Sequence, residues 1–245
     1  MLPSRNKAPA IRVYLSAAQV CPEVVSGWPT AEQEGVSPAE QCVRWLQQNT
    51  LNLPGHRLHI ELGGEWTSLF CMPFSPSMDT PAAVLRMASG YARHALGDTA
   101  PAHYAVIEPL SYGQAPIILG LDSSLAGLAS NKQLQRVEPY AIAAWNRYSD
   151  SLAERGWLAI IEPATITLLY KCGPYIHDAF VRRLAPSSIS AQAVQALIRQ
   201  QFHRPANAYY VVDEFGLIPK DEPLGSLERI SPTQPIFSRA QGGST

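Results

Sequence analysis

The chain has 245 residues, of which 46% are hydrophobic and 16% are charged, and its formal net charge is −1. This length suffices for one large domain or two smaller lobes. The near-neutral charge argues against a nucleic-acid-binding protein, which would need a basic face. Because no stretch approaches the roughly 20 apolar residues of a spanning helix and no signal peptide opens the chain, we expect no direct insertion into a membrane.

The cysteines indicate the redox compartment. They lie far apart in the chain and none forms a CxxC pair; they are Cys21, Cys42, Cys71 and Cys172. This pattern is typical of free thiols in a reducing cytoplasm.

The first half of the chain predicts a loose leader and then short strands alternating with helices. Gly63-Gly64 lies between two apolar runs, a pattern typical of a β-hairpin. Thr80-Pro81 predicts the start of a long helix. The buried stripe expected on this helix consists of Val84, Ala88, Tyr91 and Ala95. The expected elements are, in order, the leader 1–10, strands at 11–15 and 20–25, a helix at 37–49, strands at 58–62 and 65–73, and the helix at 81–96.

The second half predicts strand pairs alternating with helices, which favours mixed sheets covered by helices. Its last helix is expected to bury Val194, Leu197, Ile198 and Phe202. The expected elements are strands at 104–108 and 116–121, a short helix at 122–129, a strand at 134–137, a helix at 139–155, a strand pair at 157–161 and 165–170, a strand at 175–181, a helix at 190–203 and a strand at 208–212.

The stretch from Trp157 to Gly173 has the clearest pattern. Residues 157–161 are apolar without polar alternation, which predicts a strand buried on both faces. After a break at Glu162-Pro163-Ala164, the Thr-rich run 165–170 predicts an antiparallel partner strand. Gly173-Pro174 then ends the pair.

From Glu214 onward the composition changes. Prolines and charges separate single apolar residues, which predicts a Pro-rich tail over 214–245 that packs little. Such a segment is either a solvated end or a docking segment for a partner. Trp28, in a polar loop, is either a core residue or an exposed anchor.

The order of these elements resembles that of the PilM/GspL branch of the actin-like ATPases, the cytoplasmic assembly proteins of type IV pili and type II secretion systems. The resemblance covers about residues 10–213. It implies an α/β actin-like (ribonuclease-H-like) fold with a first lobe at 11–130 and a second at 131–213. Besides the hairpin, it rests on 58–73 (a strand–turn–strand ending in Met72-Pro73), 118–125 (a strand leading into a helix with small residues) and 137–139 (the step into a long helix).

This chain departs from the active members of that fold at both phosphate-binding turns, where acids and glycines let backbone amides approach a phosphate. The first turn, Leu15-Ser16-Ala17-Ala18, has neither an acid nor a glycine. In the second, Pro163 has no amide hydrogen, and neither Pro163 nor Ala164 readily adopts a positive φ. The resemblance therefore implies no cofactor and no ATPase activity, as in the GspL subgroup. The degenerate phosphate-loop positions of the second turn are Glu162, Pro163, Ala164 and Thr165.

The resemblance implies a non-enzymatic scaffold in the cytoplasm, held at the periphery of the inner membrane through a partner. The implied partners are membrane-anchored pilus or secretion assembly proteins. The motor ATPase and a second copy of the chain, as a homodimer, are further candidates.

Two enzymatic alternatives stay open. One is an active actin-like ATPase or sugar-kinase-like protein that binds nucleotide through unusual turns. The other is a ribonuclease-H-like nuclease, in which acids at strand ends hold two metal ions. Strand ends are also commonly polar for structural reasons, and no nucleophile elbow, P-loop or metal-ligating histidine pattern occurs. The acids concerned are Glu61, Glu108, Asp122, Glu162 and Asp213.

Overall fold

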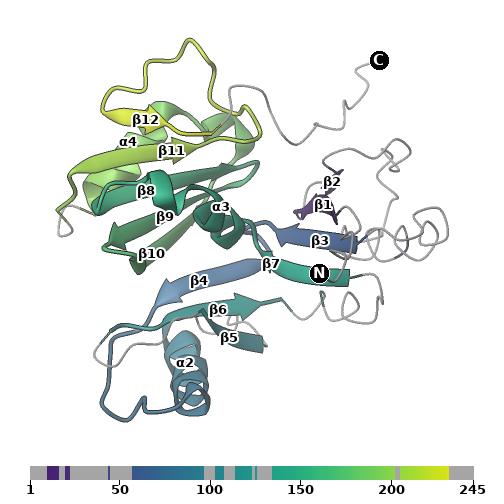
Figure 1. The fold of residues 1–245 in the computed structure, drawn as a ribbon, viewed down its shortest axis with the longest axis vertical. Coiled ribbons are helices and arrows are strands. Elements are labelled where there is room, and N and C mark those ends of the chain that lie inside the picture. Colours follow the sequence, from purple (N-terminus) through teal and green to yellow (C-terminus); the bar gives the residue numbers. More distant parts are fainter. Residues whose placement is uncertain are drawn as a thin grey trace, which may run out of the picture.

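The computed structural model describes residues 10–16, 20–22, 44, 57–96, 103–107, 114–122, 125, 134–201 and 205–231. In these ranges the strands form three sheets (Figure 1). No helix within the same ranges is both long enough and apolar enough to cross a membrane. Apart from single residues, the predictions for the leader, for a helix at 37–49, for the helix after Asp122 and for Trp28 lie outside the described residues.

The first sheet has the strand order β2-β1-β3-β7. Strand β2 is antiparallel to β1, whereas β3 is parallel to β1 and β7 is parallel to β3. Because β7 pairs with β3, it belongs to this sheet, whereas the sequence analysis placed residues 134–139 in the second lobe, 131–213. The strands are β1 (Ala10–Leu15), β2 (Val20–Pro22), β3 (Arg57–Leu62) and β7 (Leu134–Pro139).

A small sheet of order β4-β6-β5 follows the Gly63-Gly64 turn. The predicted hairpin across these glycines is wrong, because β3 pairs within the first sheet while β4 pairs with β6. The predicted pairing of 104–108 with 116–121 is confirmed, since β5 and β6 are antiparallel. The strands are β4 (Thr67–Cys71), β5 (His103–Ile107) and β6 (Ile117–Leu121).

Helix α2 (Pro81–Leu96) covers the small sheet and confirms the predicted helix. Thr80 caps it, because its Oγ1 accepts a hydrogen bond from the backbone N of Ala83 at 3.2 Å. Val84 and Ala88 are buried as predicted, and Ala92 is buried with them. Tyr91 was expected on the buried stripe but is 41% exposed, because it lies about 100° around the helix from Ala92.

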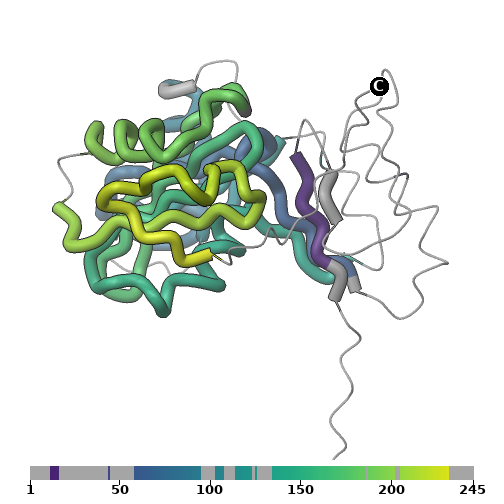
Figure 2. The backbone as a smooth tube through the Cα atoms, turned by 90° about the horizontal axis from the view of Figure 1, so that it is seen from above, coloured from purple at the N-terminus to yellow at the C-terminus, as the bar shows by residue number. Residues whose placement is uncertain are grey.

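The second sheet has the order β10-β9-β8-β11-β12. Strands β8, β11 and β12 are parallel, and β9 and β10 continue the sheet antiparallel on the other side of β8. The series β9-β8-β11-β12 repeats the topology of the first sheet, from which it lies apart in Figure 2. The strands are β8 (Arg155–Glu162), β9 (Thr165–Cys172), β10 (Tyr175–Arg183), β11 (Ala208–Val212) and β12 (Leu227–Arg229).

Strand β8 lies at the centre of this sheet with both faces buried, as predicted. Trp157 and Ile161 join a core cluster with helix α4 (Ala191–Gln200). Leu158 and Ile160 join a second cluster with helix α3 (Tyr140–Tyr148). Because successive side chains of a strand point to opposite faces, one unbroken apolar run supplies both clusters.

Helix α3 is shorter than the predicted helix at 139–155. It gives way to a 3-10 turn, η4 (Ser149–Ser151), before β8 begins. The buried Lys171 holds this turn, because its Nζ donates to the carbonyl oxygens of Ser149 (2.6 Å) and Leu152 (3.0 Å). These two carbonyl groups at the start and end of η4 therefore have a partner from β9.

Residues 214–231 pack against the second sheet, so the prediction of a loosely packed tail is wrong for this part. Phe215, Ile218 and Leu227 are at most 6% exposed, and β12 extends the sheet beside β11. The carboxylate of Asp213 holds the turn between the strands by accepting hydrogen bonds from the backbone N of Leu217 and Ile218, each at 2.9 Å.

Candidate functional site

The turn between β8 and β9 contains the residues singled out in the sequence. Glu162 and Thr165 pair across it, and Pro163 and Ala164 form its two-residue connection. In the described part of the chain only glycines have a positive φ, so Pro163 and Ala164 keep negative φ angles as predicted. The carbonyl oxygen of Ala164 accepts a hydrogen bond from the backbone N of Leu184 at 2.9 Å, which ties the turn to the end of β10.

The side chain of Glu162 points into the protein and is fully buried. Its Oε2 accepts hydrogen bonds from Tyr14 Oη (3.1 Å) and the backbone N of Gly64 (2.9 Å), and its Oε1 accepts one from Thr167 Oγ1 (3.4 Å). Burial raises the pKa of Glu162 to about 7, although the hydrogen bonds from Gly64 and Tyr14 act in the opposite direction. The carboxyl group thus links this turn to both β1 and the turn after β3.

Gly63 and Gly64 let the turn after β3 approach this site closely. A Cβ on Gly63 would lie 2.6 Å from Tyr14 Oη, and one on Gly64 would lie 2.7 Å from Thr165 Oγ1. Neither separation accommodates a side chain, so both positions require glycine. The Gly-Gly signal therefore marks a close approach of this turn to the side chains of Tyr14 and Thr165 and not a hairpin.

Three aromatic rings fill the junction between the two larger sheets. Tyr14 comes from β1, Tyr140 from the start of α3, and Phe215 from the segment after β11. The ring centroids lie 4.6 Å apart for Tyr14 and Phe215, and 5.3 Å apart for each of the other two pairs. All three side chains are at most 2% exposed, so the rings form a packed joint.

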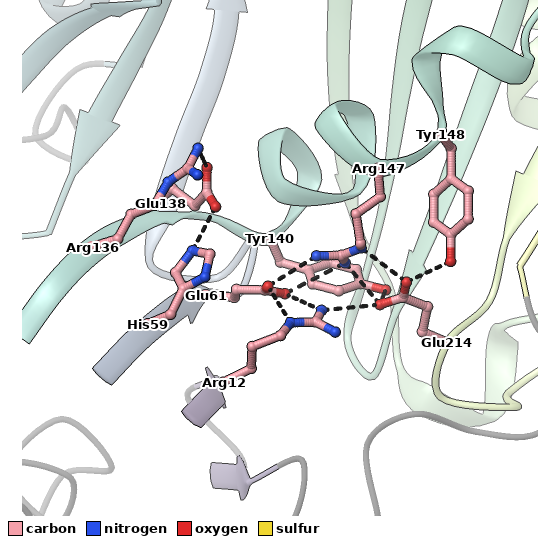
Figure 3. Close-up of polar contacts among 9 residues, drawn as sticks. All are labelled: Arg12, His59, Glu61, Arg136, Glu138, Tyr140, Arg147, Tyr148 and Glu214. Atoms are coloured by element: carbon pink, nitrogen blue, oxygen red, sulfur yellow. Dashed lines mark hydrogen bonds and ion pairs between the residues drawn. The ribbon is translucent and has the colours of Figure 1, made fainter. Parts of the chain in front are cut away.

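Beside these rings lies a group of paired charges that we call the interlobe clasp: Arg12, Glu61, Arg147 and Glu214 (Figure 3). Arg147 donates to Glu61 Oε1 at 2.9 Å and to Glu214 Oε2 at 2.8 Å. Glu61 belongs to the first sheet and Glu214 follows a strand of the second sheet, so Arg147 connects the two sheets. Arg12 contacts the same two carboxylates, at 2.8 and 3.6 Å. Both carboxylates are fully buried.

Two tyrosines complete the hydrogen bonding of Glu214. Tyr148 Oη donates to Oε1 at 2.7 Å, and Tyr140 Oη donates to Oε2 at 3.1 Å. Burial and the hydrogen bond to Glu214 raise the pKa of Tyr148. Sequence analysis did not single out either arginine of the clasp, because the only local signal is a charge at Arg12 within an otherwise apolar strand.

Those strand-end acids that the structure describes do not converge on a metal site. Glu61 pairs with the two arginines of the clasp, Glu162 binds Tyr14 and Gly64, and Asp213 binds backbone amides. Glu108 lies outside the described residues. Among those that the structure does describe, no group of three or more His, Cys, Asp or Glu side chains could hold a metal ion. His59 instead contacts Glu138 at 2.6 Å (Figure 3).

The arrangement of the sheets matches known structures. One is a Bacteroides thetaiotaomicron protein described as having an actin-like ATPase fold and unknown function. The match has a TM-score of 0.53 at 11% sequence identity and covers 86% of this chain and 85% of that chain. This chain therefore has an actin-like ATPase fold. The two-lobed α/β architecture predicted from the sequence is thus confirmed.

Two other structures share the actin-like fold with this chain. The cytoplasmic domain of EpsL, an inner membrane component of the type II secretion system of Vibrio cholerae, matches with a TM-score of 0.51 at 14% identity, over 92% of this chain and 86% of that chain. The PilM–PilN type IV pilus biogenesis complex matches with a TM-score of 0.54 at 14% identity, over 93% of this chain and 89% of that chain. No protein-family model and no curated protein matches the sequence.

Proposed function

We propose that this protein is a PilM/GspL-type scaffold that connects components of a type IV pilus or type II secretion assembly machine without hydrolysing nucleotide. Two of the proteins with a similar fold belong to such machines, one as an inner membrane component of type II secretion and the other in a type IV pilus biogenesis complex. The fold by itself serves many functions, so the argument against catalysis rests on the site.

The observation that carries the proposal is the buried carboxyl group of Glu162 at the turn that resembles a phosphate-binding turn. This carboxyl group is fully buried and already accepts hydrogen bonds from Tyr14 Oη, the backbone N of Gly64 and Thr167 Oγ1, so it is used within the protein and does not face a ligand. Fewer backbone N–H groups are available to bind a phosphate. Pro163 has no N–H group, and the N–H of Gly64 already donates to Glu162. Tyr14, Tyr140 and Phe215 further occupy the junction between the sheets.

A scaffold of this kind needs partners at the membrane. We infer that the protein works in the cytoplasm at the inner membrane and is held there by a membrane-anchored assembly protein. The motor ATPase and a second copy of the chain are further partners in this proposal. Affinity purification from the native host, followed by identification of the co-purified membrane proteins, tests this part.

Thermal denaturation with millimolar ATP and Mg²⁺ tests the absence of nucleotide binding. A ligand present at ~100 times its dissociation constant adds ~2.7 kcal/mol to the free energy of unfolding, which would raise the melting temperature by several degrees. We expect no shift beyond that given by MgCl₂ and tripolyphosphate, which serve as controls for ionic effects. A nucleotide-specific rise in melting temperature would instead support an active ATPase.

A further inference from the structure

The solvent-facing side of α2 combines apolar and basic side chains. Met87 and Tyr91 lie one helical turn apart and are 37% and 41% exposed, and they are two of the three large hydrophobic side chains exposed among the described residues. Arg86, Arg93 and His94 are exposed beside them. The helix contains no Asp or Glu, although the whole chain has a net charge of −1. The face is therefore locally basic and partly apolar.

Gly90 lies in the middle of this face and is itself exposed. Apart from the neighbouring residues and the backbone of α2 itself, no described atom lies within 4 Å of the position that its Cβ would take, so no packing contact in the described chain requires a glycine here. Glycine in a helix interior destabilises the helix relative to alanine. Its presence is explained if the backbone of another molecule approaches α2 at this point.

The side chains of this face are already held in place. The ring of Tyr91 stacks on Phe70, with centroids 5.8 Å apart and an angle of 21° between the planes. Met87 Sδ accepts a hydrogen bond from Ser77 Oγ at 3.6 Å. Figure 1 shows α2 on the outer side of the small sheet, away from β8 to β12, where a partner can reach it. A surface that is ordered before binding loses less entropy when a partner docks.

We propose that this face of α2, from Arg86 to His94, docks an acidic amphipathic helix of a partner protein whose backbone crosses α2 at Gly90. Tyr, Met and Arg are enriched at protein–protein interfaces, which supports a protein partner. The positive charge of Arg86 and Arg93 selects acidic side chains. This inference rests on the proposed scaffold function and deepens it, because it locates one docking surface and gives the chemistry of what binds there.

An anionic membrane fits this face less well than a protein does. Lipid-binding basic segments typically carry ~4–8 Lys or Arg residues, whereas α2 exposes Arg86 and Arg93. A helix that lies in a membrane surface also buries its apolar stripe in lipid. The apolar stripe of α2, formed by Val84, Ala88 and Ala92, is instead buried in the protein.

Selection of displayed helical peptides on the full chain tests the proposal. The library would hold peptides of about five helical turns with randomised surface positions, and the selected peptides would be titrated by fluorescence anisotropy. We expect them to carry Asp or Glu beside an apolar stripe. Arg86→Glu should weaken their binding by about tenfold or more, because it replaces an attractive charge with a repulsive one. Arg199→Glu, the same change at an exposed position of α4, is the matched control and should leave binding unchanged.

Gly90→Ala separates docking from folding. Because alanine is the better helix former and its Cβ meets no neighbour, this variant should melt at a higher temperature than the wild type. The same variant should bind the peptides severalfold more weakly, since the added methyl group blocks the close approach. Unchanged peptide binding by Gly90→Ala or Arg86→Glu, or selected peptides without acidic residues, would overturn the proposal.

Vesicles with and without phosphatidylglycerol distinguish a membrane from a protein partner. Arg86-dependent sedimentation with the anionic vesicles would overturn docking of a protein helix. Failure of the docking proposal can be told apart from failure of the proposed function. Stabilisation by ATP would contradict the scaffold function, whereas the peptide titrations would still show whether α2 binds an acidic helix.

Discussion

Glu162 is a buried carboxyl group whose protonation is linked to folding. Its pKa rises from the ordinary 4.5 to about 7 in the folded protein because of burial. The folded state thus holds the proton more tightly than the unfolded state. This stabilisation is complete below about pH 4.5 and is lost as the pH rises through about 7. The difference is on the order of 3 kcal/mol, since one pKa unit corresponds to ~1.4 kcal/mol.

Glu162→Gln should remove this part of the pH dependence. The amide cannot ionise but keeps an oxygen that accepts hydrogen bonds from Tyr14 and Gly64. We expect the wild type to lose stability relative to the variant as the pH rises from about 5 to about 8.5. Urea denaturation across this range measures the difference in the free energy of unfolding between the two proteins. The contributions of the histidines cancel in this difference, because both proteins contain them. Parallel pH profiles would show that Glu162 does not titrate in this range.

Among the elements, strand β8 contributes side chains to both core clusters of the second sheet because both of its faces are covered. Ile160 is fully buried within the cluster that contains α3. Ile160→Ala should lower the free energy of unfolding by about 2–5 kcal/mol, through lost burial and the cavity that remains. Val137→Ala, at a position that is 40% exposed, is the control and should change stability by less than about 1 kcal/mol. Equal losses in urea denaturation would contradict the central position of β8.

At the scale of the whole molecule, the interlobe clasp holds the two larger sheets together. Arg147→Met should destabilise the protein by about 3 kcal/mol, because removal of one partner leaves buried charge uncompensated. Arg12 still contacts both carboxylates, which keeps the loss from being larger. Arg147→Lys keeps the charge without the planar fork and should fall between the wild type and Arg147→Met. A methionine variant as stable as the wild type in urea would show that the clasp does not stabilise the fold.

The C-terminal part of the second sheet gives another test at this scale. Truncation after Asp213 removes Phe215, Ile218 and strand β12, and should cause unfolding or aggregation, because the core clusters lose buried members. Truncation after Ser231 leaves those described contacts intact and serves as the control. Circular dichroism and size-exclusion chromatography would measure the outcome. A folded monomer after truncation at Asp213 would restore the domain boundary predicted from the sequence.

The sequence by itself determined the elements whose signals are local. The apolar run of β8, its Thr-rich partner β9 and the capped, amphipathic α2 and α4 all form where the pattern predicts them. Side-chain period, capping residues and turn residues act within a few positions of each other, so their effect can be inferred without knowing the fold. The turn at Glu162 was located for the same reason.

Only the tertiary structure decided which strands pair across long separations. The Gly63-Gly64 pattern is identical for a hairpin and for a close approach to Tyr14 and Thr165, and packing chose the latter. Likewise, β7 joined the first sheet through β3, and β12 joined the second through β11. The clasp depends on Arg12 and Arg147 meeting carboxylates far away in the sequence. Such contacts form because a buried charge or an unpaired strand edge is costly unless it finds an ion-pair or hydrogen-bond partner. The partner is chosen by proximity in the folded protein, so its position in the sequence does not reveal it.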